Sequence, residues 1–490
     1  MKKFIVICIS CLSIFLISGC QKKDNIDNLS QNLTCYEINL ELDVDNKHCV
    51  ANQSIDYVNN TDQILKILKL HLYPQYFEQG ATQMVVSNTK LNTAYPNGMS
   101  YGEFDVTRVC VEREDRSIVY EGEYDDILCV DLGHSLLPNN RVNIEIEYEF
   151  TLPNCEHRFG YGNDTINLAN FYPIMCVYDA DGFNTSPYHP NGDPFYSEVA
   201  NYIVDISLND QYIVAGSGEK SVTFLVNNMK KVHFSNILVR DFAIVISKNF
   251  EIVEKTIEDT TISYYYYDDE NVEQNLKACV DAVRTFSDLF GDYPYSTLAV
   301  VKNDFVHGGM EYPCLVMISD RITDKNDYMN VIIHEIAHQW WYGMVGNDEY
   351  LHPWLDEAIT EYSTLLFYDY NDYEYTHDMM IDTNKSNYTL FITVYEDVLG
   401  SIDTSMRAVN EYSTEPEYTY CTYVKGVLMY ESLYQLIGEK TFIKGLQTYF
   451  KNNKYNNTTP DDLISAFESA SKKDLENFFD SWISGKVVIR

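Results

Sequence analysis

Polar and apolar residues alternate along much of the first half of the chain. Apolar side chains occupy every second position from residue 36 to 44 and again from 142 to 150, with charged or amide residues between them. Because successive side chains of a strand point to opposite faces, this pattern predicts half-buried antiparallel strands. Turn formers such as Pro138-Asn139-Asn140 and Asn191-Gly192-Asp193 separate the runs. We expect residues 34–251 to form an antiparallel β-sandwich-like N-terminal domain.

The spacing of apolar residues changes to a helical period in the second half. Leu276, Val280, Val283 and Phe286 follow this period, and so do apolar residues between 475 and 482. Strand-like stretches at 262–267 and 298–302 precede or interrupt the helical pattern, so a small sheet should open this half. The sequence therefore predicts an α+β multidomain protein, with a mostly helical domain over residues 252–490.

The first twenty residues resemble a secretory signal. Lys2 and Lys3 precede an apolar run from residue 4 to 17, and Ser18-Gly19-Cys20 ends the segment. This ending resembles a bacterial lipobox, which predicts a lipoprotein signal peptide at 1–20, a lipid on Cys20 and a polar tether at 21–33. An ordinary cleaved signal with an incidental cysteine is the alternative. We expect an exported protein, lipid-anchored to the extracytoplasmic face of a bacterial membrane.

Charge and cysteine content narrow the function classes. The chain has 35 Lys and Arg against 73 Asp and Glu, a net charge of −38, which argues against nucleic-acid binding and against electrostatic attraction to anionic lipids. Twelve cysteines become nine once Cys8, Cys11 and Cys20 are set aside, and no C-x-x-C pair occurs. A cysteine-based zinc site or a disulfide-dense scaffold is therefore unsupported.

The most specific pattern is His334-Glu335-Ile336-Ala337-His338, which fits H-E-x-x-H. On a helix, residues i and i+4 lie on one face, so both imidazoles can bind one metal ion while Glu335 borders its open position. Apolar residues surround the pattern from 331 to 341, which indicates an internal helix. Buried His and Glu are costly unless they pair or bind something. The alternative is two hydrogen-bonded core histidines beside a surface glutamate.

Glu357 offers a third ligand. It lies in Trp354-Leu355-Asp356-Glu357, with eighteen residues between His338 and Glu357, on a second predicted helix. A catalytic zinc site has three protein ligands and keeps one position for water, whereas a structural site closes with four. We therefore predict one Zn²⁺ per chain, bound by His334, His338 and Glu357.

These segments resemble the zinc aminopeptidases of the aminopeptidase N type, a gluzincin metallopeptidase family. Three further segments resemble family motifs in the expected order. They are His307-Gly308-Gly309-Met310-Glu311 for the Gly-x-Met-Glu-Asn exopeptidase motif, Tyr423-Val424-Lys425-Gly426 for the Tyr-x-Lys-Gly segment, and Phe478-Phe479-Asp480-Ser481-Trp482 for the helix that closes the catalytic domain. The match runs from about residue 34 to the end. It implies a thermolysin-like catalytic domain after the β domain.

The resemblance also implies roles for individual residues. Glu335 would take a proton from the attacking water and deliver it to the departing amine. Tyr423 would stabilise the charge that develops on the former carbonyl oxygen. Glu311 would bind the free α-ammonium of the peptide, and Gly308 and Gly309 would let its backbone approach as an added strand. Tyr423, as one of 41 tyrosines, has a packing role as its alternative.

The chain departs from the family pattern in places. Tyr312 follows Glu311 where Asn is usual, and Ala358 follows the third ligand where Gly is usual, so the shape of the first specificity pocket is open. The family also places a Gln or Glu of the N-terminal domain beside the substrate amine, before an aromatic-Pro pair. If Phe171-Tyr172-Pro173 contains that pair, the preceding candidates are Asn163, Asp164 and Asn167, and the sequence does not choose among them. Glu361 is either a partner of a zinc-bound imidazole or solvent-facing.

We expect a zinc-dependent aminopeptidase that removes N-terminal residues from peptides. A metalloendopeptidase could use the same metal site, and a catalytically silent lipid-anchored binding protein could keep the fold. Hydrolysis of a lipid epoxide, as in the related leukotriene hydrolase, is a further alternative that no residue demands. The expected partners are peptides with a free N-terminus and a membrane reached through Cys20. Oligomeric state does not follow from the sequence.

Overall fold

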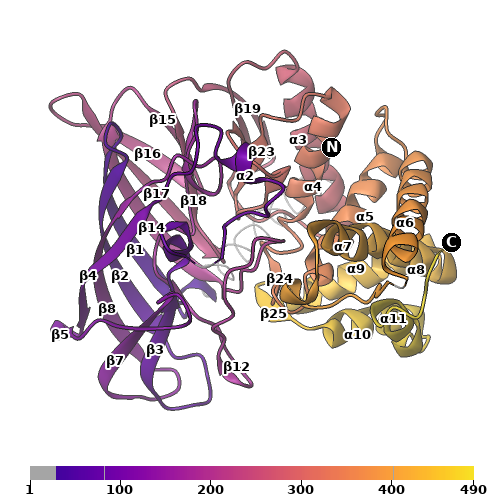
Figure 1. Cartoon of the computed structure of the whole chain (residues 1–490), viewed down its shortest axis with the longest axis horizontal. Coiled ribbons are helices and arrows are strands. Elements are labelled where there is room, and N and C mark those ends of the chain that lie inside the picture. Colours follow the sequence, from indigo (N-terminus) through magenta and orange to yellow (C-terminus); the bar gives the residue numbers. More distant parts are fainter. Residues whose placement is uncertain (1–28, 82, 401, 490) are drawn as a thin grey trace, which may run out of the picture.

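The structure is a computed structural model that describes residues 29–81, 83–400 and 402–489. Figure 1 shows strands gathered in the first half of the chain and helices in the second. The strands of the first half are β1 (Cys35–Asp43), β2 (His48–Val58), β3 (Leu65–His71), β4 (Glu103–Val111), β5 (Glu114–Arg116), β6 (Val119–Glu121), β7 (Ile127–Leu136), β8 (Arg141–Thr151), β9 (Phe159–Tyr161), β10 (Ile166–Ala169), β11 (Ile174–Met175), β12 (Tyr178–Asp179), β13 (Gly182–Phe183), β14 (Ala200–Asn209), β15 (Ile213–Gly216), β16 (Glu219–Phe224), β17 (Met229–Val239) and β18 (Ala243–Ser247). The 3-10 helix η1 (Tyr73–Phe77) and the short helix α2 (Leu91–Ala94) lie between β3 and β4.

An eight-stranded sheet dominates the first half. Its strand order is β16-β17-β14-β1-β2-β8-β4-β5. All neighbouring strands are antiparallel except β1 and β14, which run parallel with Leu40 beside Ile206. Burial alternates along β1 and β8, as their alternating sequences predict. One face of the sheet is therefore buried.

The β-rich half also contains two four-stranded sheets and the two-stranded sheet of β12 and β13. The four-stranded sheets have the orders β15-β18-β10-β9 and β11-β3-β7-β6. The strand β18 is buried along its whole length, unlike the alternating strands of the large sheet. The β-rich first half and the helical second half confirm the predicted fold class. The single parallel pair is a detail that the alternation of residues does not reveal.

The second half opens with a five-stranded sheet in the order β19-β20-β21-β23-β22. Residue 251, the predicted domain boundary, is the first residue of β19. The strands of this half are β19 (Glu251–Ile257), β20 (Thr260–Tyr266), β21 (Thr297–Asn303), β22 (Gly309–Met310), β23 (Leu315–Ser319), β24 (Val345–Asn347) and β25 (Asn456–Thr458). The helices are α3 (Val272–Phe290), α4 (Lys325–Ala337), α5 (Trp354–Tyr370), α6 (His377–Leu399), η2 (Val409–Glu411), α7 (Glu415–Thr419), the π-helix η3 (Tyr420–Val424), α8 (Lys425–Ile437), α9 (Glu439–Asn453), α10 (Pro460–Ser471) and α11 (Glu476–Ile483).

The two halves share one interior. Buried apolar side chains from Tyr36 in β1 to Trp482 in α11 belong to a single continuous cluster. Polar groups also cross the boundary: Arg240, after β17, donates to the backbone carbonyl oxygens of Tyr342 and Asn456. A site formed between the halves is therefore held from both sides.

The described part of the chain gives two further facts. Its nine cysteines are all free thiols, and eight of them are buried. It contains no helix that is both long and apolar enough to cross a bilayer. The predicted signal peptide, Cys20 and most of the tether lie outside the described residues.

Candidate metal and peptide site

The helix that carries the H-E-x-x-H pattern begins directly after a capping residue. Asp324 caps α4 by accepting hydrogen bonds from the backbone N–H groups of Asn326 and Asp327. The helix runs to Ala337, so His334 and His338, one turn apart, face the same side. It packs against β23 and against α5, which carries Glu357. The predicted pair of helices therefore brings all three ligands together.

The ligand atoms have the spacing of a zinc site. Nε2 of His338 lies 3.1 Å from Nε2 of His334 and 3.1 Å from Oε2 of Glu357, and Nε2 of His334 lies 3.5 Å from the same oxygen. Ligands that are about 2.0–2.1 Å from a tetrahedral zinc ion are about 3.3–3.4 Å from one another. The donor set, two imidazoles and one carboxylate, is also one that catalytic zinc uses. The residues therefore fit the ion.

The other nitrogen of each imidazole has a partner of its own. Nδ1 of His338 lies 2.8 Å from the backbone oxygen of Trp341, and Nδ1 of His334 lies 2.8 Å from Oε2 of Glu361. Such contacts fix the tautomer that leaves Nε2 free for a metal. The structure therefore supports Glu361 as a partner of the His334 imidazole over the alternative of a solvent-facing residue.

The electrostatic field at this point favours a cation. Although burial acts in the opposite direction, Glu311 and Glu357 raise the pKa of His338 to about 10. Burial also opposes ionisation of Glu357, yet His338 and His334 lower its pKa to about 2. A site that would hold extra protons when empty of metal gains by exchanging them for a divalent ion.

Glu335 lies between the metal ligands and β22. Its side chain is buried, and burial raises its pKa to about 7. The carboxylate lies so close to Gly309 that a Cβ added at that glycine would overlap it. Residue 309 is thus confined to glycine by a close approach. A carboxyl with this pKa can accept and return a proton near neutral pH.

Tyr423 reaches the site from an unusual element. It lies in the π-helix η3, between α7 and α8, and its hydroxyl donates to Oε1 of Glu357. A single π turn often occurs where a functional side chain must be displaced from regular helical spacing. Tyr423 is therefore directed at the metal site and does not serve only in packing.

Glu311 follows β22, an edge strand of the five-stranded sheet. Gln339 holds the chain here by donating to the backbone oxygens of Glu311 and Tyr312. The Glu311 side chain is 3% exposed, and its Oε1 has no hydrogen-bond partner among the described residues. Burial, with Asp193 and Glu335 adding to it, raises the pKa of Glu311 well above its usual value. A bound cation would stabilise the ionised form.

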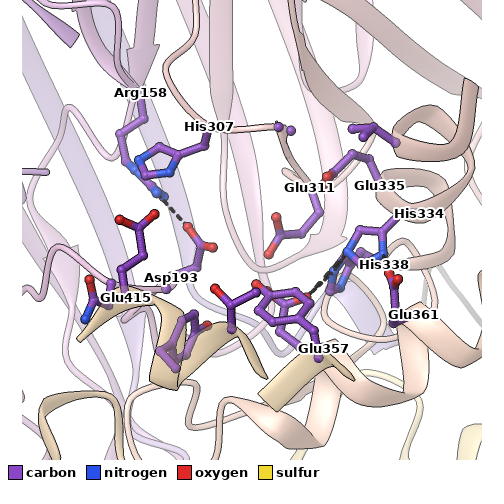
Figure 2. Close-up of a pocket in the computed structure, with 18 of the residues that line it drawn as sticks. Arg158, Asp193, His307, Glu311, His334, Glu335, His338, Glu357, Glu361 and Glu415 are labelled. Atoms are coloured by element: carbon purple, nitrogen blue, oxygen red, sulfur yellow. Dashed lines mark hydrogen bonds and ion pairs between the residues drawn. The ribbon is translucent and has the colours of Figure 1, made fainter. Parts of the chain in front are cut away.

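The β-rich half contributes Asp193 and Arg158 to the same pocket. Arg158 is buried and donates from Nη2 to Oδ1 of Asp193 over 2.6 Å. Both residues line the pocket with Glu311. Figure 2 shows the Asp193 carboxylate between Arg158 and Glu311. The sequence missed Asp193 because Asn191-Gly192-Asp193 has the composition of an ordinary turn.

The N-terminal residues considered from the sequence have other positions. Asn167 donates to the backbone oxygens of His157 and Asp304, and Asp164 accepts from Asn249. Neither residue is part of the pocket wall, and neither is Asn163. None of the three candidates therefore lines this pocket. The chain reaches the pocket with the loop 190–193 instead.

The two departures from the family pattern also lie away from the pocket. The Tyr312 hydroxyl donates to Asn170 of the β-rich half over 2.7 Å. Ala358 packs so closely against Gly426 that a Cβ added at Gly426 would overlap the Cβ of Ala358. Neither residue lines the pocket. Tyr312 and Ala358 contribute to the packing around the site, and other residues form the wall of the pocket.

Two of the motif-like segments meet through one lysine. The buried Lys425 donates to the backbone oxygens of Thr404 and Trp482, both over 2.6 Å. Burial lowers its pKa to about 8. Lys425 therefore ties the start of α8, and with it Tyr423, to the closing helix α11.

The pocket has a volume of about 290 Å³ and extends from the metal ligands past Glu311 and Asp193. In Figure 2, Arg158, His307 and Glu415 lie at the end opposite His334. The wall also includes Gly308, Gly309, Tyr418, Tyr423 and Lys90. The residues of the second half that were predicted to contact the metal or the peptide therefore all line one cavity.

Comparison with known proteins gives matches of two kinds. Residues 274–482 match the peptidase family M1 domain. The solved structure of an M1 zinc metallopeptidase from Deinococcus radiodurans aligns with a TM-score of 0.67 at 16% identity, over 94% of this chain and 96% of that one. A variant of that protein has been solved bound to a Tyr-Ser-Ala substrate, and it aligns with a TM-score of 0.65. These structures share the fold.

Curated relatives are distant and much longer. Aminopeptidase 2 of Candida albicans is 23% identical over 320 residues, which is 59% of this chain and 33% of the relative. Aminopeptidase N of Lactococcus lactis subsp. lactis is 27% identical over 228 residues, 42% of this chain and 26% of the relative. The chain spans about a third or less of the length of the relatives it matches. Residues 274–482 therefore resemble the peptidase family M1 domain, and the resemblance of the chain to the zinc aminopeptidases of the aminopeptidase N type is confirmed.

Proposed function

We propose that the protein is a zinc-dependent aminopeptidase that removes the first residue of peptides with a free N-terminus. The observation that carries this proposal is one pocket in which His334, His338 and Glu357 can hold the metal while Glu335 and Glu311 lie beside it. When bound, zinc would supply a Lewis acid and lower the pKa of a coordinated water toward about 7.

The chain's own groups would carry the proton and orient the substrate. Glu335 accepts the proton of the attacking water and returns it to the departing amine, a role that its raised pKa suits. The Tyr423 hydroxyl, which donates to Glu357 in this structure, would donate to the oxygen of the scissile carbonyl. The free edge of β22 offers backbone groups at Gly309 with which an extended peptide can pair.

Two carboxylates, one from each half, would select the free amine. Glu311 has an unpartnered buried oxygen, and Asp193 is held in place by Arg158. A substrate α-ammonium between them would supply the counterion that Glu311 lacks and place the first peptide bond over the metal. An acetylated N-terminus brings no charge, so the buried Glu311 would stay without a counterion.

The test is cleavage of aminoacyl-arylamides and free-amine peptides by the purified protein and by Glu335→Gln. We expect Glu335→Gln to reduce kcat by about a hundred- to ten-thousandfold, because it cannot accept a proton. Zinc content, measured by elemental analysis, should stay at one ion per chain. A variant that keeps wild-type turnover would refute the assignment of the base.

A metalloendopeptidase with the same metal site is the second candidate, supported by the same three ligands. Equal rates on free and N-acetylated peptides would favour it over an aminopeptidase. A silent binding protein would show stoichiometric zinc and no turnover on any peptide. The position of Glu335 and Tyr423 at the metal ligands supports catalysis over this alternative.

We further propose that the protein is exported and held at the extracytoplasmic face of a bacterial membrane by a lipid on Cys20. Support comes from the sequence alone: the basic and apolar leader and Ser18-Gly19-Cys20. Expression of wild type and Cys20→Ser in a bacterial host, with labelled fatty acid, tests it. Label and membrane fractionation should both be lost in the variant. Equal recovery of both proteins in the soluble fraction would contradict the anchor.

A further inference from the structure

One part of the pocket wall is formed across the boundary between the two halves. The loop Ser87–Lys90, just before α2, meets Glu415, the first residue of α7. Nζ of Lys90 lies 2.7 Å from Oε1 of Glu415, and the hydroxyls of Ser87 and Thr89 donate to Oε2 over 2.7 and 3.0 Å. We call Lys90 and Glu415, with these two hydroxyls, the crossbar.

The crossbar is inside the pocket and is still reached by solvent. The side chains of Lys90 and Glu415 are 31% and 25% exposed, and both line the cavity that holds the metal ligands. Although burial acts to raise it, the contacts with Lys90 and Ser87 lower the pKa of Glu415. Glu415 therefore carries the negative charge that Lys90 needs.

Among the described residues, Glu415 is the carboxylate that pairs with Lys90. On its other side, Nζ lies 3.1 Å from Nδ1 of His307, whose Nε2 lies 3.2 Å from Nε2 of His157. Burial lowers the pKa of both imidazoles well below the usual value, so neither ring adds charge at neutral pH. The ion pair with Glu415 thus determines where the end of the Lys90 side chain rests.

A second loop of the β-rich half approaches the same helix. Gly192, in the loop 190–193, has a φ of +71° and lies against Tyr418 of α7, where an added Cβ would overlap the ring. Helix α7 is therefore contacted by two loops of the β-rich half, residues 87–90 and the loop that carries Asp193. Glu415, at the start of this helix, lines the pocket and lies farther from His334 than Asp193 does (Figure 2).

We propose that the crossbar is a specificity device: it limits the length of the first side chain that the pocket accepts. With the α-ammonium between Glu311 and Asp193, a side chain that extends away from the metal meets Lys90 and Glu415. A short side chain fits in front of the crossbar, whereas a long or bulky one must displace it. This inference rests on the proposed aminopeptidase function and adds the substrate class, namely peptides that begin with a small residue.

The experiment measures kcat/KM for two peptides that differ only in their first residue, Ala or Trp, with wild type, Lys90→Ala and Glu415→Gln. We expect wild type to favour Ala. Lys90→Ala should raise the Trp-to-Ala ratio by about tenfold or more, as is usual when a pocket gains room for several carbon atoms. Glu415→Gln, which breaks the ion pair without adding room, should raise the ratio by a smaller factor. Glu415→Gln keeps acceptors for the two hydroxyls, so it reports on the ion pair if Lys90→Ala folds poorly.

Reversing both charges distinguishes an effect of the ion pair between Lys90 and Glu415 from an effect of the packing of either side chain alone. The double variant Lys90→Glu with Glu415→Lys restores the pair with opposite signs, and it should return the ratio toward wild type while each single reversal raises it. Lys69→Ala is the matched control, because Lys69 forms a 2.6 Å ion pair with Glu121 away from the pocket. That control should leave the ratio unchanged.

Failure of the inference and failure of the proposed function are distinguishable. A wild-type protein that cuts neither peptide overturns the aminopeptidase assignment itself. An active wild type with a ratio that Lys90→Ala and Glu415→Gln do not change overturns the crossbar alone. A wild type that already favours Trp also overturns it.

Discussion

At the scale of residues, the pocket separates two tasks among its carboxylates. Glu335 and Glu357 lie on α4 and α5 at the predicted metal site, whereas Glu311 follows the edge strand β22 of the helical half and Asp193 comes from a loop of the β-rich half. The first pair is local to two helices, and its spacing along the chain is enough to predict it. The second pair depends on how the two halves dock.

Asp193→Asn tests this division. Removing one charged partner of a bound ammonium costs about 1.5–3 kcal/mol, so we expect kcat/KM for free-amine peptides to fall about ten- to a hundredfold, mainly through KM. Asn keeps an oxygen for Arg158, and zinc content should not change. Steady-state kinetics on free and N-acetylated versions of one peptide provide the measurement.

Asp164→Asn is the matched control. Asp164 is a carboxylate of the same half, and it accepts a hydrogen bond from Asn249 outside the pocket. It should keep wild-type kinetics. If Asp193→Asn lowered the rates on both peptides equally, Asp193 would not bind the amine.

Sequence reasoning succeeded where function follows from spacing within one helix or between two neighbouring helices. His334, His338, Glu357 and Glu335 are such cases, and Glu361 was at least considered. It failed for Asp193 and Arg158, because their role arises from contact between distant segments. The guess at Asn163, Asp164 and Asn167 failed for the same reason: proximity along the chain to Phe171-Tyr172-Pro173 does not place a side chain in the pocket.

At the scale of elements, the feature least predictable from the sequence is the π-helix η3. The π-helix that presents Tyr423 to Glu357 has no marker in the sequence, because its residues fit an α-helix equally well. The short pair β24 and β25 was also not predicted, since three-residue strands give too little alternation to recognise. The long strands β1 and β8 and the helix α3 were predicted closely, because their patterns extend over many residues.

One histidine at the start of α6 also connects this helix to α5 and α8. His377, the first residue of α6, lies 2.8 Å from Oδ2 of Asp369 in α5 and 3.1 Å from Oε2 of Glu431 in α8. Although burial opposes its charging, these two carboxylates raise the pKa of His377 to about 9. Its protonated form therefore holds the three helices together.

This raised pKa predicts a pH dependence of stability. The contribution of His377 is fully present below its unfolded pKa of about 6.5 and is lost as pH rises through about 9. We expect His377→Gln to destabilise the protein by about 1–2 kcal/mol at pH 6, after allowance for the screening of a partly exposed ring. The deficit should shrink by pH 10. Urea denaturation at a series of pH values measures it.

His48→Gln serves as the comparison, because His48 forms only a 3.8 Å contact with Glu149 on the surface. Its effect should stay small at every pH. A deficit for His377→Gln that does not vary with pH would show that the imidazole acts only by packing.

At the scale of the whole molecule, the two halves form one working unit. The metal ligands belong to the helical half, but Asp193, Arg158 and Lys90 come from the β-rich half. Arg240 secures the contact: besides two carbonyl oxygens of the helical half, it bonds Oδ1 of Asn457 and the backbone oxygen of Ser197, and it is 1% exposed. Its removal would leave several buried acceptors unpaired.

We therefore expect Arg240→Ala to lower the free energy of unfolding by at least about 3 kcal/mol, since each unpaired buried acceptor costs about 1–3 kcal/mol. Peptidase activity should be lost at a lower temperature than in wild type. Thermal denaturation and residual activity after heating are the measurements.

Arg141→Ala is the control. Arg141 also bonds an acid and backbone oxygens, but it lies at the surface with 36% of its side chain exposed. Its replacement should cost about 1 kcal/mol or less. Similar losses for both variants would show that the contact between the halves is not held by Arg240.

The origin of the pocket wall in two loops of the β-rich half has a consequence for how such an enzyme can diversify. Under the proposed function, substitutions in residues 87–90 and 190–192 would change which first residues the pocket accepts without touching Asp193 or any metal ligand. Loops tolerate such changes better than packed helices do. Selection, or an engineer who exchanges those two loops, would then alter the accepted peptides while the residues around the metal stay constant.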